Sequence, residues 1–275
     1  MIHSPVFQAF AGDVLSRRTA EIGMHLHAWT SPPLEPLTRD DTQALPYLIE
    51  YLPRVMREKV HALTVTIEDT LGIKVLSHRA GRWAFDERYA EILLDEGYAV
   101  DCSVTPLVDW RTTLGDPAGR GGIDYSAFPR EAYWIDLRDI SRPGTSGLLE
   151  VPVTIDSFRS AFTQRIVGAA DALPRRLRAD AHRVANRLSP VEVWLRPNGR
   201  NRKQLGRLVE RVLQERRRYA QFVLHSSELM PGGSPTFPDS AAIERLYADV
   251  EYLFESIATR FRGTTLSEFH RGMLT

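Results

Sequence analysis

The stretch EIGMHLHAW, residues 21–29, says most about the fold of this chain. Successive side chains of a strand point to opposite faces, so we expect His25 and His27 to share one face and Met24 and Leu26 the other. Neutral imidazole nitrogens are good ligands for Zn²⁺ at neutral pH. A lone His-x-His pair is more often an ordinary polar strand end, so its interpretation depends on the rest of the sequence.

The composition is that of a globular protein with enough chain for a sizeable core, and we expect a single domain over residues 1–275. No apolar run approaches the roughly 20 residues that a membrane helix needs. The first residues lack the features of a secretory signal. Cys102 is the only cysteine, which excludes an internal disulfide and fits a reducing compartment. These features predict a cytoplasmic protein without a membrane span.

Positive charge is concentrated between residues 175 and 218, where 14 Lys and Arg stand against 4 Asp and Glu. Such a block can attract an anionic polymer. However, leucines and valines recur among these arginines at helical spacing, and no aromatic platform for single-stranded nucleic acid accompanies them. We therefore expect a solvated helix face and no nucleic-acid partner. A sugar-nucleotide or nucleic-acid binder is the most distant alternative.

Strand-like and helical segments alternate along the chain, which predicts an α/β fold with a parallel sheet. We expect strands around residues 22–27, 73–78, 98–103, 148–154, 191–196 and 221–225. We expect helices around residues 52–71, 87–94, 157–188, 205–213 and 243–261. A further helix before the first strand is expected to begin near Asp13.

Polar residues lie where several of these strands should end. In folds of this kind the carboxyl ends of the strands, and the loops after them, build the active site. The residues at these positions are His25, His27, His78, Arg79, Asp101, Thr154, Arg196 and His225. Their types are those that bind metals, transfer protons or hold anions, so the sequence predicts an enzyme.

Four motifs, in the right order, resemble those of the polysaccharide deacetylases of the NodB-homology type (carbohydrate esterase family 4). The branch most similar to this chain occurs in bacterial O-antigen and exopolysaccharide loci and includes the WbmS-like proteins. Residues 21–25 resemble the metal motif, normally Glu-Ile-Gly-Asn-His with a second histidine four residues after the first. Residues 79–83 resemble the arginine-led groove motif, 97–110 the segment ending in Asp-Trp, and 224–225 the late Leu-x-Leu-His motif.

This resemblance implies a distorted (β/α)₇-type barrel and a divalent metal, usually zinc, held by two histidines and an aspartate. His25 would be the first metal ligand. The second histidine of the family falls at Trp29 here, so we assign the second ligand to His27, which strand geometry permits. The metal polarises the acetyl carbonyl and lowers the pKa of a bound water.

The resemblance also implies catalytic roles for His225 and Arg79, and Asp101 is a third candidate because of its position at a strand end. His225 would be the general acid that protonates the departing amine. Arg79 would lower the pKa of the catalytic carboxylate and so keep it ionised, although a buried structural arginine is an equal alternative. Asp101 would orient Arg79 or a metal ligand, with a turn aspartate as its alternative.

Three further residues are candidates for binding the acetylated oligo- or polysaccharide. Trp83 and Trp110 have aromatic faces that can stack on pyranose rings, although core packing is the stronger alternative for either one alone. Arg196, before Pro197, could bind a phosphate or carboxylate of the sugar. With His25, His27, Arg79, Asp101 and His225, these residues complete the predicted site.

One departure from the family concerns its first motif, a Thr-Phe-Asp-Asp-like run that closes the first strand. That run is absent here, and residues 10–13, Phe-Ala-Gly-Asp, hold a single aspartate. The missing motif normally supplies the metal aspartate and the catalytic base, so we expect an incomplete barrel that lacks its first strand and binds metal weakly. Two hypotheses follow: a metal-dependent deacetylase of bacterial surface polysaccharide, acting in cell envelope biosynthesis, or a catalytically impaired glycan-binding member of the same fold.

Overall fold

The structure is a computed structural model that describes residues 1–158 and 192–274. The chain divides into two compact units. The first comprises Met1–Pro152 and Gly263–Thr275, and the second comprises Val153–Arg262. Each unit is described by itself, and the expectation of a single domain over residues 1–275 stays a prediction.

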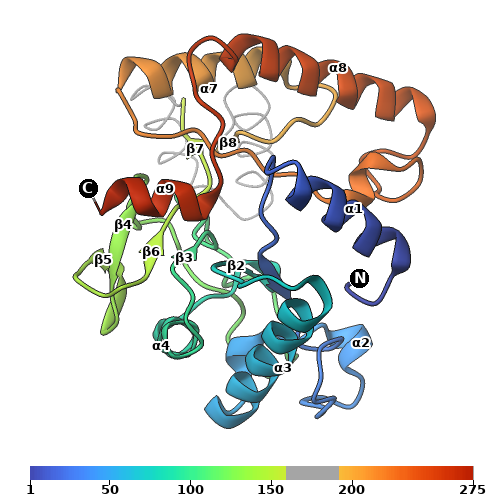
Figure 1. Cartoon of the computed structure of the whole chain (residues 1–275), viewed down its shortest axis with the longest axis vertical. Coiled ribbons are helices and arrows are strands. Elements are labelled where there is room, and N and C mark those ends of the chain that lie inside the picture. The colour runs from blue at the N-terminus through green and yellow to red at the C-terminus, as the bar shows by residue number, and fades with distance from the viewer. Residues whose placement is uncertain (159–191, 275) are drawn as a thin grey trace, which may run out of the picture. The chain divides into compact units, whose positions relative to one another are not determined.

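The first unit contains a mixed six-stranded sheet (Figure 1). In spatial order its strands are β1 (Met24–Leu26), β2 (Ser77–Ala80), β3 (Val100–Asp101), β6 (Leu149–Glu150), β4 (Tyr133–Asp136) and β5 (Asp139–Pro143). The first four strands of this order run parallel, whereas β4 is antiparallel to both β6 and β5. The predicted α/β class is therefore confirmed, and the barrel stays a prediction.

Helices pack on both sides of this sheet (Figure 1). They are α1 (Pro5–Ser16), α2 (Asp41–Ala44), α3 (Pro53–Leu71), α4 (Glu87–Asp95) and α9 (Leu266–Met273), with 3₁₀ turns at Leu48–Glu50 and Gly81–Trp83. Helices α3 and α4 lie on one side and α9 on the other. Helix α3 ends as predicted at Gly72, whose left-handed conformation (φ 64°) favours a residue without a side chain.

The core of the first unit lies between the sheet and α3 and α4. Met24 and Leu26 of β1 are buried there, as the alternation of the strand predicts. Lys59 of α3 is also buried, and its ammonium group donates hydrogen bonds to the carbonyl oxygens of Ala28, Ser31 and Pro33. This lysine therefore holds the loop that follows β1.

The second unit is built on two long helices and a small sheet. Strands β7 (Ile155–Asp156) and β8 (Val193–Trp194) pair antiparallel, and α7 (Arg202–Gln214) packs against α8 (Ser240–Ile257). A 3₁₀ turn, η3, spans Ser226–Leu229. The apolar side of α7 is buried at Leu205, Leu208, Val209 and Val212. The helix expected over residues 157–188 lies almost wholly outside the described residues.

Several local predictions were wrong. The helix before β1 begins at Pro5, which suits a first helical turn, so Asp13 lies near its end rather than its start. Residues 148–154 do not form one strand, because Pro152 cannot donate to a ladder and separates β6 from β7. Residues 221–225 are not a strand either. Val223 donates to the carbonyl oxygen of Leu195 at 3.2 Å and Gln221 accepts from the N–H of Thr154 at 3.3 Å, but these two bonds do not make a strand of the segment.

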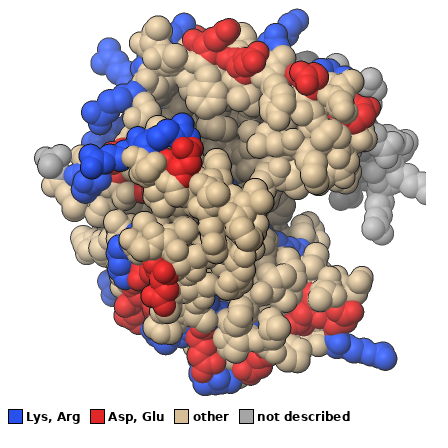
Figure 2. Space-filling view, turned by 45° about the vertical axis from the view of Figure 1, so that its right-hand side comes forward, with Lys and Arg blue, Asp and Glu red and all other residues tan. Residues whose placement is uncertain are grey.

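Two further properties bear on the setting of the protein. Over the described ranges, the structure has no helix that is both long and apolar enough to cross a membrane. On the face in Figure 2, clusters of Lys and Arg are interspersed with groups of Asp and Glu. Charges of both signs at the surface agree with a formal net charge of 0 for the chain.

Candidate functional site

Strand register in the first unit places the polar residues of the strand ends in two rows, one on each face of the sheet. Met24 pairs with His78, His78 with Asp101, and Asp101 with Glu150. Paired residues of neighbouring strands point to the same face. The row of His78, Asp101 and Glu150 therefore lies on the face that carries Met24, and His25 and Arg79, paired with each other, lie on the opposite face.

The first row is a buried hydrogen-bonded network around Asp101. Its carboxylate lies 2.5 Å from Nδ1 of His78 and accepts hydrogen bonds from Ser103, through the hydroxyl at 2.8 Å and the backbone N–H at 2.9 Å. Nε2 of His78 lies 2.7 Å from the Tyr89 hydroxyl. Burial alone would raise the pKa of Asp101, but the imidazole and the hydrogen bonds outweigh it and hold that pKa below its usual value.

Glu150 extends this network as a neutral acid. Burial, followed by the charge of Asp101, raises the pKa of Glu150 well above its ordinary value. Its Oε1 accepts from the N–H of Val104 at 3.0 Å, while Oε2 receives no hydrogen bond from any described residue. A protonated carboxyl group at Glu150 avoids a second buried negative charge beside Asp101. Sequence reasoning missed Glu150, although a single carboxylate inside the apolar run of residues 148–153 is a signal that could have found it.

Ser103 links this network to the end of β2. Its hydroxyl accepts a hydrogen bond from the N–H of Ala80 at 2.7 Å while it donates to Asp101. Ala80 follows Arg79, whose carbonyl oxygen faces the second row. The buried network therefore fixes the backbone on which the second row depends.

His25 is the central residue of the second row. Its Nδ1 lies 2.8 Å from the carbonyl oxygen of Arg79, which can only accept, so Nδ1 carries the hydrogen. Burial lowers the pKa of His25 to about 3, so the ring is neutral at physiological pH. Its Nε2 is buried and has no hydrogen-bond partner among the described residues. His25 therefore presents a lone pair in a fixed direction, as metal-binding histidines held by a backbone carbonyl do.

His27 lies beside His25, as the sequence predicted. The two ring centroids are 4.6 Å apart at an interplanar angle of 82°, and the ring of His27 also lies 4.6 Å from that of Trp29. Gly81 leaves the space for this arrangement, because a Cβ there would lie 2.2 Å from the carbonyl oxygen of Leu26 and 2.8 Å from Nδ1 of His27. The close approach of β2 to the end of β1 thus requires glycine at position 81.

His25 opens into a pocket of about 390 Å³ within the first unit, lined also by Glu21, Ser77, Arg79, Cys102 and Thr265. Glu21 was not among the predicted site residues, although it opens the motif of residues 21–25. Its Oε2 accepts hydrogen bonds from the hydroxyl and the N–H of Ser267 at the start of α9. Its Oε1 is buried without a partner among the described residues. The pocket therefore holds two unsatisfied polar atoms, one nitrogen and one oxygen.

The predicted metal fits these residues in part. His25 and His27 supply two imidazoles side by side, and the lone pair on Nε2 of His25 is a suitable donor. Among the described residues, however, no group of three or more His, Cys, Asp or Glu side chains is arranged to hold a metal ion. The two histidines therefore suit the neutral ligands of a metal site.

Arg79 and Trp83 form the other side of the second row. The guanidinium carbon of Arg79 lies 5.4 Å from the centroid of the Trp83 ring, a cation–π contact. Within the described ranges no carboxylate lies at ion-pair distance from Arg79, and Asp101 contacts His78 on the other face. The catalytic roles of Arg79 and Asp101 stay predictions. Trp110 lies outside the residues that line this pocket, and its indole N–H donates to the Thr105 hydroxyl at 2.9 Å.

The two remaining predicted residues, Arg196 and His225, belong to the second unit, where Glu228 connects them. The guanidinium of Arg196 lies 2.5 Å from Oε1 of Glu228, and the backbone N–H of His225 donates to Oε2 at 3.0 Å. Glu228 is buried, whereas His225 is exposed at the start of η3. Glu228 was not among the predicted site residues.

Comparisons with known proteins add no relative to these observations. No family model matches the sequence, and no curated protein matches it. The chain is an α/β protein with a polar pocket lined by residues of β1 and β2, by the segment before β1 and by Cys102 directly after β3.

Proposed function

We propose that this chain is a metal-dependent hydrolase that removes acetyl groups from N-acetylated sugars of a bacterial surface polysaccharide. The observation that carries the proposal is the pocket in which His25 and Glu21 each leave a buried polar atom without a hydrogen-bond partner among the described residues. An unsatisfied buried polar atom costs free energy, so its presence in a pocket favours a ligand that completes it. The motif similarity of residues 21–25, 79–83, 97–110 and 224–225 points to the same chemistry.

In this proposal the residues of the second row bind and orient the substrate and the metal. His25 and His27 would hold a divalent ion, Zn²⁺ above all, which when bound polarises a carbonyl and acidifies a water molecule. The carbonyl oxygen of Arg79 accepts a hydrogen bond from Nδ1 of His25 and so holds this ring in the tautomer whose Nε2 is unprotonated. Arg79 and Trp83 would bind the sugar, with Trp110 and Arg196 as further contacts. His225 would act as the general acid that protonates the departing amine.

A glycan-binding protein of the same fold is the second candidate function. The observation that favours it is a pair of aromatic rings close to the histidine pair and Arg79: the ring of Trp29 lies beside that of His27, and the ring of Trp83 lies beside the guanidinium of Arg79. Aromatic faces stack on sugar rings in the ground state, so they bind a glycan whether or not a reaction follows.

Metal and substrate assays on the full chain, purified without a histidine tag, test both candidates. Wild-type protein should bind Zn²⁺ weakly by calorimetry and release acetate from N-acetylated oligosaccharides, and His25→Ala should lose both properties. His61→Ala is the matched control, because His61 is an exposed histidine of α3 paired with Glu96. Its binding and activity should equal those of wild type.

Three results would change this assignment. Zn²⁺ binding that is tight, stoichiometric and retained in His25→Ala would place the metal ligands elsewhere. Glycan binding without acetate release, over a series of N-acetylated oligosaccharides with Zn²⁺ present, would favour the glycan-binding protein. Neither binding nor release would remove both candidates.

A further inference from the structure

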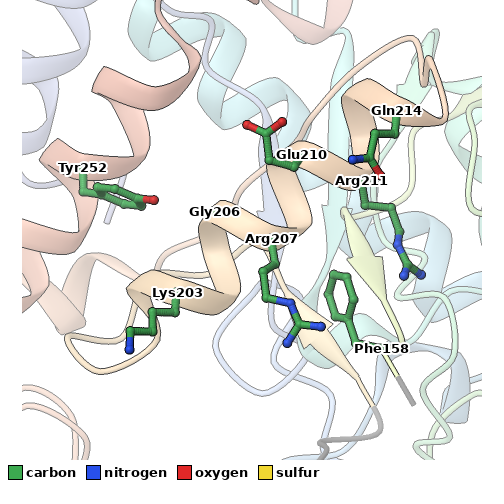
Figure 3. Close-up of a pocket in the computed structure, with 8 residues that line it drawn as sticks. All are labelled: Phe158, Lys203, Gly206, Arg207, Glu210, Arg211, Gln214 and Tyr252. Carbon is green, nitrogen blue, oxygen red and sulfur yellow. The ribbon is translucent and has the colours of Figure 1, made fainter. Parts of the chain in front are cut away.

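A row of cationic side chains on α7 forms one wall of a second cavity, within the second unit. Lys203, Arg207 and Arg211 are four residues apart, so they lie on one face of the helix, and Figure 3 shows them pointing to the same side. The cavity has a volume of about 650 Å³ and is also lined by Phe158, Gly206 and Tyr252. It is separate from the pocket around His25, because all its lining residues belong to the second unit.

The charges of this row are only partly neutralised by the protein. Arg211 lies 3.5 Å from Asp156 and donates to the carbonyl oxygen of Ser157 at 3.2 Å. Lys203 and Arg207 are exposed, and neither has a carboxylate at ion-pair distance within the part of the chain that the structure describes. Like charges four residues apart on a helix repel each other. An anion bound between Lys203 and Arg207 would relieve that repulsion.

The arginines of this row are held in place before any ligand binds. The guanidinium carbons of Arg207 and Arg211 lie 4.8 and 4.4 Å from the centroid of the Phe158 ring, so one aromatic ring supports both. Figure 3 shows Phe158 between these two side chains. Cation–π contacts of this kind restrict the rotamers of arginine. Less side-chain entropy is then lost when an anion binds.

Among the described residues that line this cavity, Glu210 carries the acidic side chain, and it pairs with Arg260. In Figure 3 its carboxylate points away from the guanidinium of Arg207. The hydroxyl of Tyr252 lies beside Gly206, where a Cβ would be 2.6 Å from it. Glycine at this position therefore leaves room for the Tyr252 hydroxyl in the cavity wall.

From this arrangement we propose that the cavity binds the diphosphate group of a small phosphorylated ligand. Lys203 and Arg207 are about 6 Å apart along the helix axis, at ~1.5 Å per residue. Two linked phosphoryl groups can reach both cations, whereas a single carboxylate or orthophosphate reaches one well. The planar guanidinium of Arg207 can hold one phosphoryl group with two parallel hydrogen bonds. The ammonium group of Lys203 can bind the other phosphoryl group.

Calorimetric titration of the full chain with inorganic pyrophosphate at low ionic strength tests this proposal. We expect one site whose affinity falls as salt is added, and about tenfold weaker binding in Lys203→Ala and in Arg207→Ala. Arg262→Ala is the matched control, because Arg262 is an exposed arginine of the same unit outside the cavity. Its affinity should equal that of wild type, and orthophosphate should bind wild type at least tenfold more weakly than pyrophosphate.

Four outcomes would overturn the proposal. The first is that pyrophosphate does not bind at millimolar concentration, and the second is that Arg207→Ala binds it as tightly as wild type. The third is that orthophosphate and pyrophosphate bind wild type with equal affinity. The fourth is that a short single-stranded oligonucleotide of much higher affinity displaces pyrophosphate. The last result would assign the row to nucleic acid. The test is independent of the deacetylase proposal, since it needs no acetate release and no residue of the first unit.

Discussion

The two rows at the strand ends of the first unit face opposite sides of one sheet and differ in how completely their polar groups are satisfied. In the buried row, the carboxylate of Asp101 is bonded to His78 and Ser103, and Glu150 is a neutral acid beside it. In the second row, His25 is anchored through one nitrogen and leaves the other without a partner. A closed network stabilises a fold, whereas an incomplete one suits a ligand. From this contrast we expect the first row to stabilise the fold and the second row to bind a ligand.

The largest expected effect comes from breaking the buried row at its centre. Asp101→Ala should lower the free energy of unfolding by about 3–5 kcal/mol, because it leaves the buried His78 without its carboxylate partner. Urea denaturation at pH 7 measures this loss. Cys102→Ala, at the next position, is the control and should cost about 1 kcal/mol. A loss under 1 kcal/mol in Asp101→Ala would contradict the structural role of this row.

A smaller effect is expected where the buried row meets β2. Ser103→Ala should lower the free energy of unfolding by about 1–2 kcal/mol, since the N–H of Ala80 loses its acceptor. Ser126→Ala, an exposed serine that also bonds a nearby aspartate, should change it by less than about 0.5 kcal/mol. The shift of the His25 Nδ1 resonance in Ser103→Ala would show whether the network also positions the second row. An unchanged resonance would show that the buried network does not position His25.

The protonation of Glu150 should make stability depend on pH in a defined direction. Its pKa is raised in the folded protein, so folding retains a proton that the unfolded chain releases above about pH 4. That contribution to stability is complete below this pH and declines as the pH rises. Glu150→Gln has no proton to lose, so it should exceed wild type by about 1 kcal/mol at pH 7 and match it below pH 4. A variant less stable than wild type at pH 7 would show that Glu150 is ionised in the fold.

The smallest effect on stability is expected in the second row. His25→Asn should change the free energy of unfolding by less than about 1 kcal/mol, because the Asn amide can still donate to the carbonyl of Arg79 and one unsatisfied buried nitrogen is removed. Thermal and urea denaturation measure this change. A loss as large as that of Asp101→Ala would mean that both rows are structural, and the contrast between them would fail.

Much of the local structure follows from the sequence. The helix expected around residues 52–71 is α3, and the alternation of residues 24–27 correctly predicted that His25 and His27 lie side by side. Other elements did not follow. The β4–β5 hairpin was not predicted, and the strand expected at 221–225 is absent from the described structure. Short apolar runs become strands only if a neighbouring chain supplies a ladder, and the sequence does not encode that neighbour locally.

The alternation of strand-like and helical segments in the sequence was enough to predict the α/β class. The spacing of His25 and His27 was enough to predict that their side chains lie side by side. Only the tertiary structure decided that Asp101 bonds to His78 rather than to Arg79, and that Glu21 and Glu150 belong to this region. The reason is register. A shift of one residue moves a side chain to the other face of a sheet, and register is set by pairing between segments that are distant along the chain.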